Sequence, residues 1–275
     1  LKADDEKAIL EILRIGTSAG GARPKAVIAY NERTGEVRSG QTNVPKNFEH
    51  YLIKLDGVSD IQLGQSLGYG RVEMAYYNMA KACGIEMMPS LLLEESGRAH
   101  FMTKRFDREG ESTRHHIQTF CAMKHFDFNQ VTSYSYEQLF QTMRELKLDY
   151  QAAEQMFRRM VFNVAARNCD DHTKNFAFRL KQNSKWELAP AYDICHAYKP
   201  EHKWVSQHAL SINGKRKDVT KEDLLVIGSS IKNKKAEAII DEIGDVVSNW
   251  KKFADEVKVA PKLRDVIDAT LVRLK

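Results

Sequence analysis

A short polar run between two apolar segments is the part of the sequence best suited to chemistry. Its charged and amide side chains are Arg167, Asn168, Asp170, Asp171, His172, Lys174 and Asn175. A helix predicted over 150–166 leads into the run, and an apolar strand predicted over 176–178 follows it. Because an unpaired buried charge is costly, polar groups held between buried elements must be paired, hydrogen-bonded or bound to metal. This pattern is typical of a catalytic loop.

Asp170 and Asn175 have the D-x-x-x-x-N spacing of a protein-kinase catalytic loop. In such a loop the Asp accepts the proton of the substrate hydroxyl and the Asn holds a magnesium ion. A further carboxylate is available at Asp193, at the end of the apolar run 188–194. Because Mg²⁺ binds hard oxygen ligands and needs only one or two carboxylates besides substrate phosphates, Asn175 and Asp193 suffice. Asp171 is an extra carboxylate that could perturb the pKa of Asp170 or join the metal site.

The cysteines offer a second metal chemistry. The chain has four, at Cys83, Cys121, Cys169 and Cys195, without C-x-x-C spacing. This usage favours a reducing cytosol over a disulfide framework. Cys169 with His172, or Cys195 with His196, could form a zinc site, but the spacing is loose and the same loop has a better use in phosphoryl transfer.

Composition sets the class of protein. Its 275 residues are 43% hydrophobic and 29% charged, enough for one large domain or two small lobes with a sizeable core. No apolar run has the length of a membrane span and no signal peptide is visible, so we expect a cytoplasmic protein. A net charge of +5 permits acidic partners without requiring them. The basic tracts 215–217 and 232–235 are expected to be solvated loops.

The N-terminal part of the sequence has the features of a nucleotide-binding lobe. The Gly-, Ala- and Ser-rich run 16–25 could hold a phosphate in a nest of backbone N–H groups, or be a flexible linker into a hairpin. Lys54 stands inside an apolar strand predicted over 48–55, where a kinase places the lysine that contacts nucleotide phosphates, although a snorkelling role is common there. Glu73, in a helix predicted over 69–83, could orient Lys54, but a surface glutamate is favoured.

The order of elements indicates a mixed α/β (α+β), two-lobed protein-kinase-like fold. Strands are predicted over 26–30, 36–41, 48–55, 90–94 and 99–106. Helices are predicted over 4–15, 69–83, 118–125, 135–146, 150–166, 220–228, 234–250 and 253–274. We therefore expect a small β-rich N-lobe over 1–106 and a mostly helical C-lobe over 107–275.

Four motifs, in order over nearly the whole chain, resemble those of the HipA family. They are Ser18–Lys25 (SAGGARPK), Lys104–Arg108 (KRFDR), Asp170–Asn175 (DDHTKN) and Ala191–Asp193 (AYD). Members of this family are bacterial serine/threonine-protein kinases that act as toxins in toxin–antitoxin modules. The Ala-Arg-Pro-Lys form of the glycine-rich loop is similar to the longer, YjjJ-like branch.

The resemblance implies an ATP- and Mg²⁺-dependent kinase. It implies that Asp170 is the catalytic residue and that Asn175 and Asp193 are the magnesium ligands. The residues implied to contact the nucleotide are Ser18, Ala19, Gly20, Gly21, Lys25, Lys54, Lys104, Arg105, Phe106, His172, Lys174 and Tyr192. Ser18 also falls where family members autophosphorylate, an event that switches the kinase off, since a phosphoserine would repel the phosphates of ATP.

The family also implies partners. Its members phosphorylate translation components, notably aminoacyl-tRNA synthetases, and pair with a HipB-type antitoxin through which DNA is contacted only indirectly. One alternative is a small-molecule phosphotransferase that uses the same ATP site. Another is a non-catalytic protein that binds ATP or an antitoxin in a transcriptional repressor complex. The presence of Lys54, Asp170, Asn175 and Asp193 argues against the non-catalytic alternative.

Overall fold

The computed structural model describes residues 24–40, 44–59, 62–63, 66–130 and 132–274. The chain divides into two compact units, each assembled from separate stretches of the sequence. The first unit comprises Leu1–Ala75, Met88–His115 and Ala254–Leu263. The second unit comprises Tyr76–Met87, His116–Phe253 and Arg264–Lys275.

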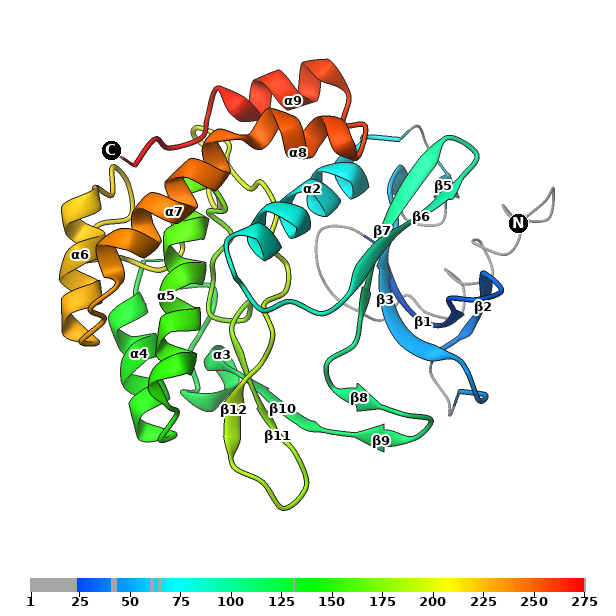
Figure 1. Ribbon diagram of the computed structural model, residues 1–275, viewed down its shortest axis with the longest axis horizontal. Coiled ribbons are helices and arrows are strands. Elements are labelled where there is room, and N and C mark those ends of the chain that lie inside the picture. The colour runs from blue at the N-terminus through cyan, green and yellow to red at the C-terminus, as the bar shows by residue number, and fades with distance from the viewer. Residues whose placement is uncertain (1–23, 41–43, 60–61, 64–65, 131, 275) are drawn as a thin grey trace. The chain divides into compact units, whose positions relative to one another are not determined.

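The first unit is built on a five-stranded antiparallel sheet with the strand order β2-β1-β3-β7-β6 (Figure 1). Its strands are β1 (Lys25–Asn31), β2 (Glu36–Ser39), β3 (Glu49–Lys54), β6 (Ser90–Glu95) and β7 (Arg98–Lys104). Since side chains alternate along a strand, every second residue of β1 and β3 shares a face. That face contributes to a core of Ala26, Ile28, Tyr51, Ile53, Leu55, Leu93 and Met102.

Turn chemistry explains how β1 leads into β2. The side-chain oxygen of Asn31 accepts hydrogen bonds from the backbone N–H groups of Arg33 (3.0 Å) and Thr34 (3.2 Å). Gly35 completes the turn at a φ of +73°, which a residue without Cβ adopts at low cost. This unit also contains two short hairpins, β4 (Val58–Ser59) with β5 (Gln62–Leu63) and β8 (Arg108–Glu109) with β9 (Thr113–Arg114).

Helix α2 (Tyr69–Ala82) begins in the first unit, where a buried carboxylate binds its N-terminus. Asp56 accepts hydrogen bonds from two backbone N–H groups just before the helix, at 3.2 Å each. Such an acceptor satisfies N–H groups that have no partner within the helix. Gly70 allows close packing against β7, since a Cβ there would lie 1.9 Å from the carbonyl oxygen of Ala99. Both contacts fix the first turns of α2, from which Glu73 projects.

The second unit is mostly helical. Its helices include α3 (Phe120–Met123), α4 (Tyr136–Glu145), α5 (Tyr150–Ala165), α6 (Lys221–Ser230) and α7 (Ala236–Ser248). A three-stranded sheet accompanies them, in the order β10 (His116–Thr119), β11 (Ala177–Leu180) and β12 (Trp186–Leu188). Helix α5 packs against α4 and α7 and is buried along most of its length. It therefore positions the residues that follow it.

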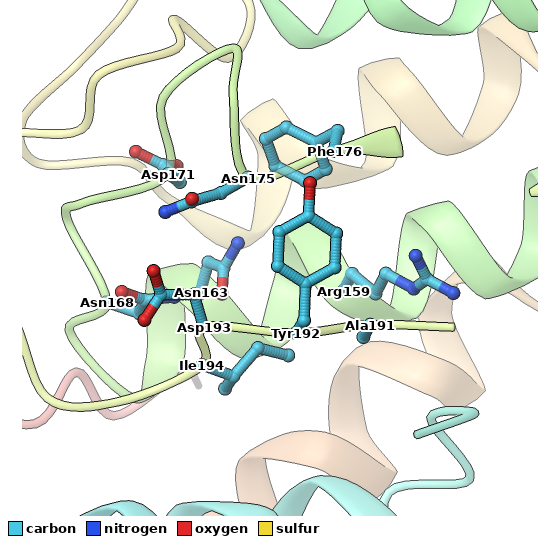
Figure 2. A pocket seen from close by; sticks show the side chains of 10 residues that line it. All are labelled: Arg159, Asn163, Asn168, Asp171, Asn175, Phe176, Ala191, Tyr192, Asp193 and Ile194. Carbon is cyan, nitrogen blue, oxygen red and sulfur yellow. Dashed lines mark hydrogen bonds between the residues drawn. The ribbon is translucent and has the colours of Figure 1, made fainter. Parts of the chain in front are cut away.

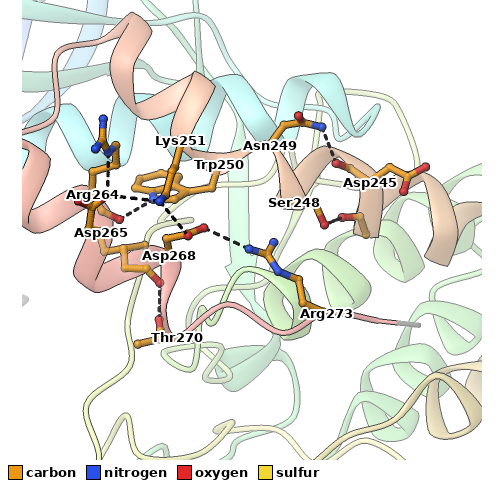
Figure 3. Close-up of polar contacts among 12 residues, drawn as sticks. Asp245, Ser248, Asn249, Trp250, Lys251, Arg264, Asp265, Asp268, Thr270 and Arg273 are labelled. Carbon is orange, nitrogen blue, oxygen red and sulfur yellow. Dashed lines mark hydrogen bonds and ion pairs between the residues drawn. The ribbon is translucent and has the colours of Figure 1, made fainter.

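Two further helices, α8 (Trp250–Glu256) and α9 (Pro261–Asp268), lie near the C-terminal end of the sequence, and polar contacts join their residues (Figure 3). The indole N–H of the fully buried Trp250 donates to the carbonyl oxygen of Arg264 at 2.9 Å. The Lys251 ammonium lies 3.6 Å from Asp265 and 3.5 Å from Asp268. The single helix predicted over 253–274 is therefore wrong. Proline suits the first turn of a helix and not its interior, so a new helix begins at Pro261.

The other predicted helices show which signals are reliable. The predictions over 135–146, 150–166 and 220–228 are confirmed by α4, α5 and α6, which have side-chain caps at Ser135, Asp149 and Thr220. The prediction over 118–125 is wrong in extent, because β10 occupies its start and only Phe120–Met123 is helical. The predicted helix 4–15 lies outside the described residues. Within the described part of the chain, no helix combines the length and apolar character needed to cross a membrane.

Candidate active site

The polar run follows α5 directly, and backbone hydrogen bonds hold it in place. Arg167, just past the helix, has a φ of +53°, which turns the chain out of the helix. The N–H groups of Phe120 and Cys121, in α3, donate to the carbonyl oxygens of Phe176 (2.7 Å) and Thr173 (3.0 Å). The run is thus pinned at its end, where β11 begins. The predicted loop between buried elements is confirmed.

Asp170 presents its carboxylate at the surface of this loop. Its side chain is 45% exposed, and its Oδ1 lies 3.7 Å from Nε2 of His172. The side-chain amide of Asn175 donates to the main-chain oxygen of Asp170 at 2.7 Å. The two residues of the D-x-x-x-x-N motif are therefore in direct contact, with the Asp170 carboxylate accessible enough to meet a substrate hydroxyl.

Asp171 points the other way. Its carboxylate is buried and accepts hydrogen bonds from the Tyr136 hydroxyl (2.9 Å) and the backbone N–H of Ala209 (2.7 Å). The ring nitrogen Nδ1 of His208 lies 2.9 Å from the same carboxylate. Asp171 also lines the small cavity described next, but both of its oxygens already bond to protein groups, so we assign it a supporting role in the loop.

Asn175 and Asp193 line one small cavity (Figure 2). Its volume is about 10 Å³, which is room for about one water molecule or ion. Asn175 uses its amide nitrogen on Asp170, so its oxygen Oδ1 remains for the cavity. Asp193 has a φ of +55°, an uncommon conformation for a residue other than glycine. Carboxylate and amide oxygens are hard ligands, so this donor set fits Mg²⁺.

Two of the predicted nucleotide contacts of the second unit, Lys174 and His172, lie next to Phe128, an aromatic residue that the sequence analysis did not single out. The Lys174 ammonium lies 3.1 Å from the ring centroid of Phe128, and the His172 ring lies 6.4 Å from it. The hydroxyl of Tyr192 donates to the carbonyl oxygen of Lys174 at 2.6 Å. Burial and the charge of Asp193 raise the pKa of Tyr192, so this hydroxyl stays protonated. Together these contacts order the loop between Asp170 and Asn175.

Thr270, in the C-terminal segment, contacts both the loop that contains Asp170 and the segment that contains Asp193 and His196. Arg167 Nε donates to the carbonyl oxygen of Thr270 at 3.0 Å, and His196 Nε2 lies 2.9 Å from the Thr270 hydroxyl. Burial and the nearby Arg167 lower the pKa of His196 to about 4, so its ring is neutral at pH 7. Backbone bonds join the loops to each other, from Cys169 N to Ala197 O (3.0 Å) and from Ala197 N to Arg167 O (3.1 Å). The segments that contain Asp170 and Asp193 are thereby tied together.

The zinc alternative has no support in these surroundings. Cys169 and Cys195 are buried cysteines that form no disulfide, and His196 already contacts Thr270. Burial raises the pKa of Cys169 to about 12, which disfavours the thiolate that zinc requires. In the part of the chain that the structure describes, no three His, Cys, Asp or Glu side chains form a group suited to a metal ion.

In the first unit, Lys54 forms a buried ion pair with Glu73. Their side chains are 6% and 1% exposed, so the favoured assignment of Glu73 to the surface is wrong. The reason is tertiary: the face of α2 that carries Glu73 also buries Val72 and Tyr76. Lys54 lies opposite Lys25 in the β1–β3 ladder, which places both predicted nucleotide contacts on neighbouring strands.

The predicted hinge residues are engaged within the first unit. Lys104 pairs with Glu49 at 3.0 Å, and the Arg105 guanidinium makes two bonds, of 2.9 and 2.6 Å, to Asp107. Their backbone N–H groups donate to the carbonyl oxygens of Pro89 and His50. A contact between these N–H groups and adenine would need those bonds to open. The role of Lys104, Arg105 and Phe106 in nucleotide binding stays a prediction. The four predicted contacts Ser18, Ala19, Gly20 and Gly21 lie outside the described residues.

Sequence reasoning also missed two residues at the cavity, Arg159 and Asn163, and gave Asn168 no role beyond its place in the polar run. Arg159, Asn163 and Asn168 line it and are buried. Burial lowers the pKa of Arg159 to about 10, and no hydrogen-bond partner for its Nε or Nη2 is found within the described residues. The available signal was that Arg159 and Asn163 stand at helical spacing with the apolar Met156 and Met160, where a charged or amide side chain is uncommon unless it has a polar function.

Comparison with known proteins places this geometry in a family. A family model described as the HipA-like C-terminal domain matches residues 17–250. The chain is similar in structure to one from the complex of HipA, HipB and operator DNA of the toxin–antitoxin system of Shewanella oneidensis MR-1. The TM-score is 0.64 at 18% identity, over 92% of this chain and 62% of that one. It is also similar to the Helicobacter pylori proinflammatory kinase CtkA, with a TM-score of 0.48 at 16% identity, over 91% of this chain and 92% of that one.

No curated protein matches the chain by sequence. The likeness to the Shewanella protein confirms the predicted kinase-like α/β fold, although this chain spans only about 62% of that protein. The family model covers both the Asp170 loop and Asp193. The chain therefore belongs to the family of proteins with a HipA-like C-terminal domain.

Proposed function

We propose that this chain is an ATP-dependent serine/threonine-protein kinase of the HipA type. The observation that carries the proposal is the cavity that Asn175 and Asp193 share, next to the exposed carboxylate of Asp170. An acidic base beside a set of hard oxygen donors is the arrangement that phosphoryl transfer needs. The buried pair of Lys54 and Glu73 supports the same assignment, since a lysine held by a glutamate is a recurring phosphate contact in kinases.

In the proposed reaction, a protein Ser or Thr hydroxyl attacks the γ-phosphorus of ATP. A phosphorus–oxygen bond forms to the substrate, the bond to the β–γ bridging oxygen breaks, ADP leaves and Asp170 takes up the hydroxyl proton. Mg²⁺, held by Asn175 and Asp193, would supply neutralising charge for the phosphates. Asn175 also holds the backbone of Asp170 in place, so that orientation of the base is built into the loop.

Transfer of labelled phosphate from ATP tests the assignment of the base. Asp170→Asn should lower turnover by roughly 10²–10⁴-fold, the scale for loss of a general base. Nucleotide binding, measured by calorimetry, should be retained. Asp218→Asn changes another exposed aspartate in the second unit and should keep full activity. Full activity of Asp170→Asn would exclude Asp170 as the base.

Autophosphorylation of Ser18 is part of the proposal and rests on the family resemblance. Intact-mass spectrometry after incubation with Mg·ATP should show a phosphate on the wild type and none on Asp170→Asn or Ser18→Ala. A phosphate on Ser18→Ala would move the modified residue elsewhere. If a protein target is phosphorylated while metabolites are not, the reaction is that of a protein kinase; the reverse result would favour a small-molecule phosphotransferase.

We further propose a HipB-type antitoxin as partner and a translation component, such as an aminoacyl-tRNA synthetase, as target. The similar Shewanella protein was solved with HipB and operator DNA, which supports the first of these. DNA would be contacted through the antitoxin. The chain alone should then bind DNA weakly and in a salt-sensitive manner in a gel-shift assay. Tight, sequence-specific binding without antitoxin would contradict this proposal.

A further inference from the structure

A chain of hydrogen bonds with a defined direction begins at the buried Asp171. The Asp171 carboxylate accepts a bond from Ala209 N at 2.7 Å and another from the Tyr136 hydroxyl at 2.9 Å. A carboxylate group accepts hydrogen bonds through its oxygens. Burial and the charge of Asp171 hold the pKa of Tyr136 well above its usual value, so Tyr136 keeps its proton. The direction of the first bond is therefore from Tyr136 to Asp171.

This direction passes to the next two side chains. Since the only proton of the Tyr136 hydroxyl is given to Asp171, its oxygen must accept from the group behind it. That group is Nδ2 of Asn163, at 3.0 Å. With its nitrogen so assigned, Asn163 offers Oδ1 to Asn168, whose Nδ2 donates to it at 2.9 Å. All of these side chains are buried, so bulk water cannot take the place of a missing partner.

This chain of hydrogen bonds ends at the side-chain amide oxygen of Asn168, Oδ1. Asn168 lines the cavity of about 10 Å³ together with Asn175 and Asp193 (Figure 2). Its nitrogen is used on Asn163, and no hydrogen bond to its Oδ1 is found within the described residues. Asn175 is oriented in the same way, because its nitrogen donates to Asp170. The amide oxygens of Asn168 and Asn175 thus lie at a cavity that Asp193 also lines, and oxygen atoms are the ligands that Mg²⁺ prefers.

We infer that Asn168 is a third oxygen donor of the metal site and that Asp171 and Tyr136 are positioning residues that determine which atom Asn168 presents. The inference rests on the proposed function, because it deepens the metal site that phosphoryl transfer requires. Asn168 would act directly or through one bound water. Asp171 thereby influences the metal without contacting it, in the way that outer hydrogen-bond partners orient metal ligands elsewhere.

A substitution that reverses the direction of these hydrogen bonds tests the inference. In Asp171→Asn the new amide can keep its oxygen on Ala209 N and turn its two N–H groups toward Tyr136 and His208. Tyr136 must then donate to Asn163, which flips and donates to Asn168. Asn168 flips in turn and presents N–H groups to the cavity. Every group in the chain stays hydrogen-bonded, yet the metal site loses one oxygen donor and gains a repelling dipole.

A second substitution should restore the oxygen. Asn168→Asp presents an acceptor oxygen both to Asn163 and to the cavity. It therefore fits the reversed direction of the hydrogen bonds and is incompatible with the original direction. In the wild-type background the new carboxylate faces Oδ1 of Asn163, and both are acceptors. In the Asp171→Asn background the flipped Asn163 donates to it. The double variant also keeps the net charge of the wild type. The two substitutions should therefore be strongly non-additive.

The first readout is the binding of Mn²⁺ in the presence of a non-hydrolysable ATP analogue. Binding is measured from the electron paramagnetic resonance signal of the Mn²⁺ that remains free. We expect Asp171→Asn to weaken Mn²⁺ binding about tenfold or more, on the scale of outer-partner substitutions, and the double variant to recover most of that loss. A metal-free melting curve gives a second readout. There Asn168→Asp alone should melt about 2–4 °C lower, for one hydrogen bond lost, and the double variant should recover.

The outcomes separate two failures. Additive effects in both readouts, or unchanged Mn²⁺ binding in Asp171→Asn while Asp193→Asn abolishes it, would overturn the role of Asn168 and leave the proposed function standing. If the wild type binds no Mn²⁺ with the nucleotide analogue, the metal site of the proposed function fails, and the assignment of Asn168 to it fails as well. Non-additivity with recovery in both readouts supports the inference.

Discussion

Removal of either partner of the Lys54–Glu73 ion pair should strongly destabilise the first unit. The two side chains are 6% and 1% exposed, so the charge left behind has little access to water. Breaking a buried pair in this way costs about 3–5 kcal/mol in the free energy of unfolding. Glu73→Gln and Lys54→Met should each show a loss of this size, since each removes the opposite charge that the remaining buried side chain is paired with.

The double variant distinguishes this explanation from a simple loss of contacts. Lys54→Met combined with Glu73→Gln leaves no charge buried, and replacement of both members of a buried pair is often close to neutral. The double variant should therefore be more stable than either single variant. The coupling between the two positions should reach several kcal/mol, beyond the roughly 0.5–3 kcal/mol seen for most contacting residues.

Calorimetric unfolding and urea titration of the four proteins measure these differences. Glu49→Gln serves as the control, because Glu49 pairs with Lys104 on the same sheet at 3.0 Å but with side chains 42% and 28% exposed. Exposed pairs contribute about 0–1 kcal/mol, so this variant should unfold almost like the wild type. Additive losses at Lys54 and Glu73, or single losses as small as that of Glu49→Gln, would refute the reasoning.

Three further perturbations follow from the second unit. The folded-state pKa of His196 is lowered to about 4, below its usual 6.5, so the unfolded chain binds the proton first. Stability should fall as the pH drops from about 6.5 to 4, and His196→Gln should flatten that part of the melting-temperature profile. Thr270→Val removes the hydroxyl that contacts His196 and the carbonyl oxygen of Ile267. It should lower the free energy of unfolding, measured with urea, by about 1–3 kcal/mol. An unchanged urea midpoint would show that the C-terminal segment does not hold the loops. Burial raises the pKa of Cys169 to about 12, so native protein at pH 8 should resist alkylation at this thiol by mass spectrometry, whereas rapid labelling would mean that the loop opens readily.

Local patterns in the sequence were sufficient for the elements whose signals lie close together along the chain. Helices α4, α5 and α6 each combine an apolar period with a capping residue, and both signals act within one or two turns. The contact between Asp170 and Asn175 is equally local, because the motif closes on itself through a single hydrogen bond. The break between α8 and α9 was missed even though Pro261 marks it, since the apolar period continues across the break.

Only the tertiary structure decided which polar residues are buried and what they meet. Glu73 is an ordinary helical glutamate until Lys54, on a strand nineteen positions earlier, is placed against it. Asp171 stands beside Asp170, yet its partners Tyr136 and His208 are thirty-five and thirty-seven positions away. A side chain's face and its hydrogen-bond direction depend on groups that the chain brings together from a distance. The sequence by itself therefore determined the family and the acid–amide motif, and the tertiary structure determined the network that orients it.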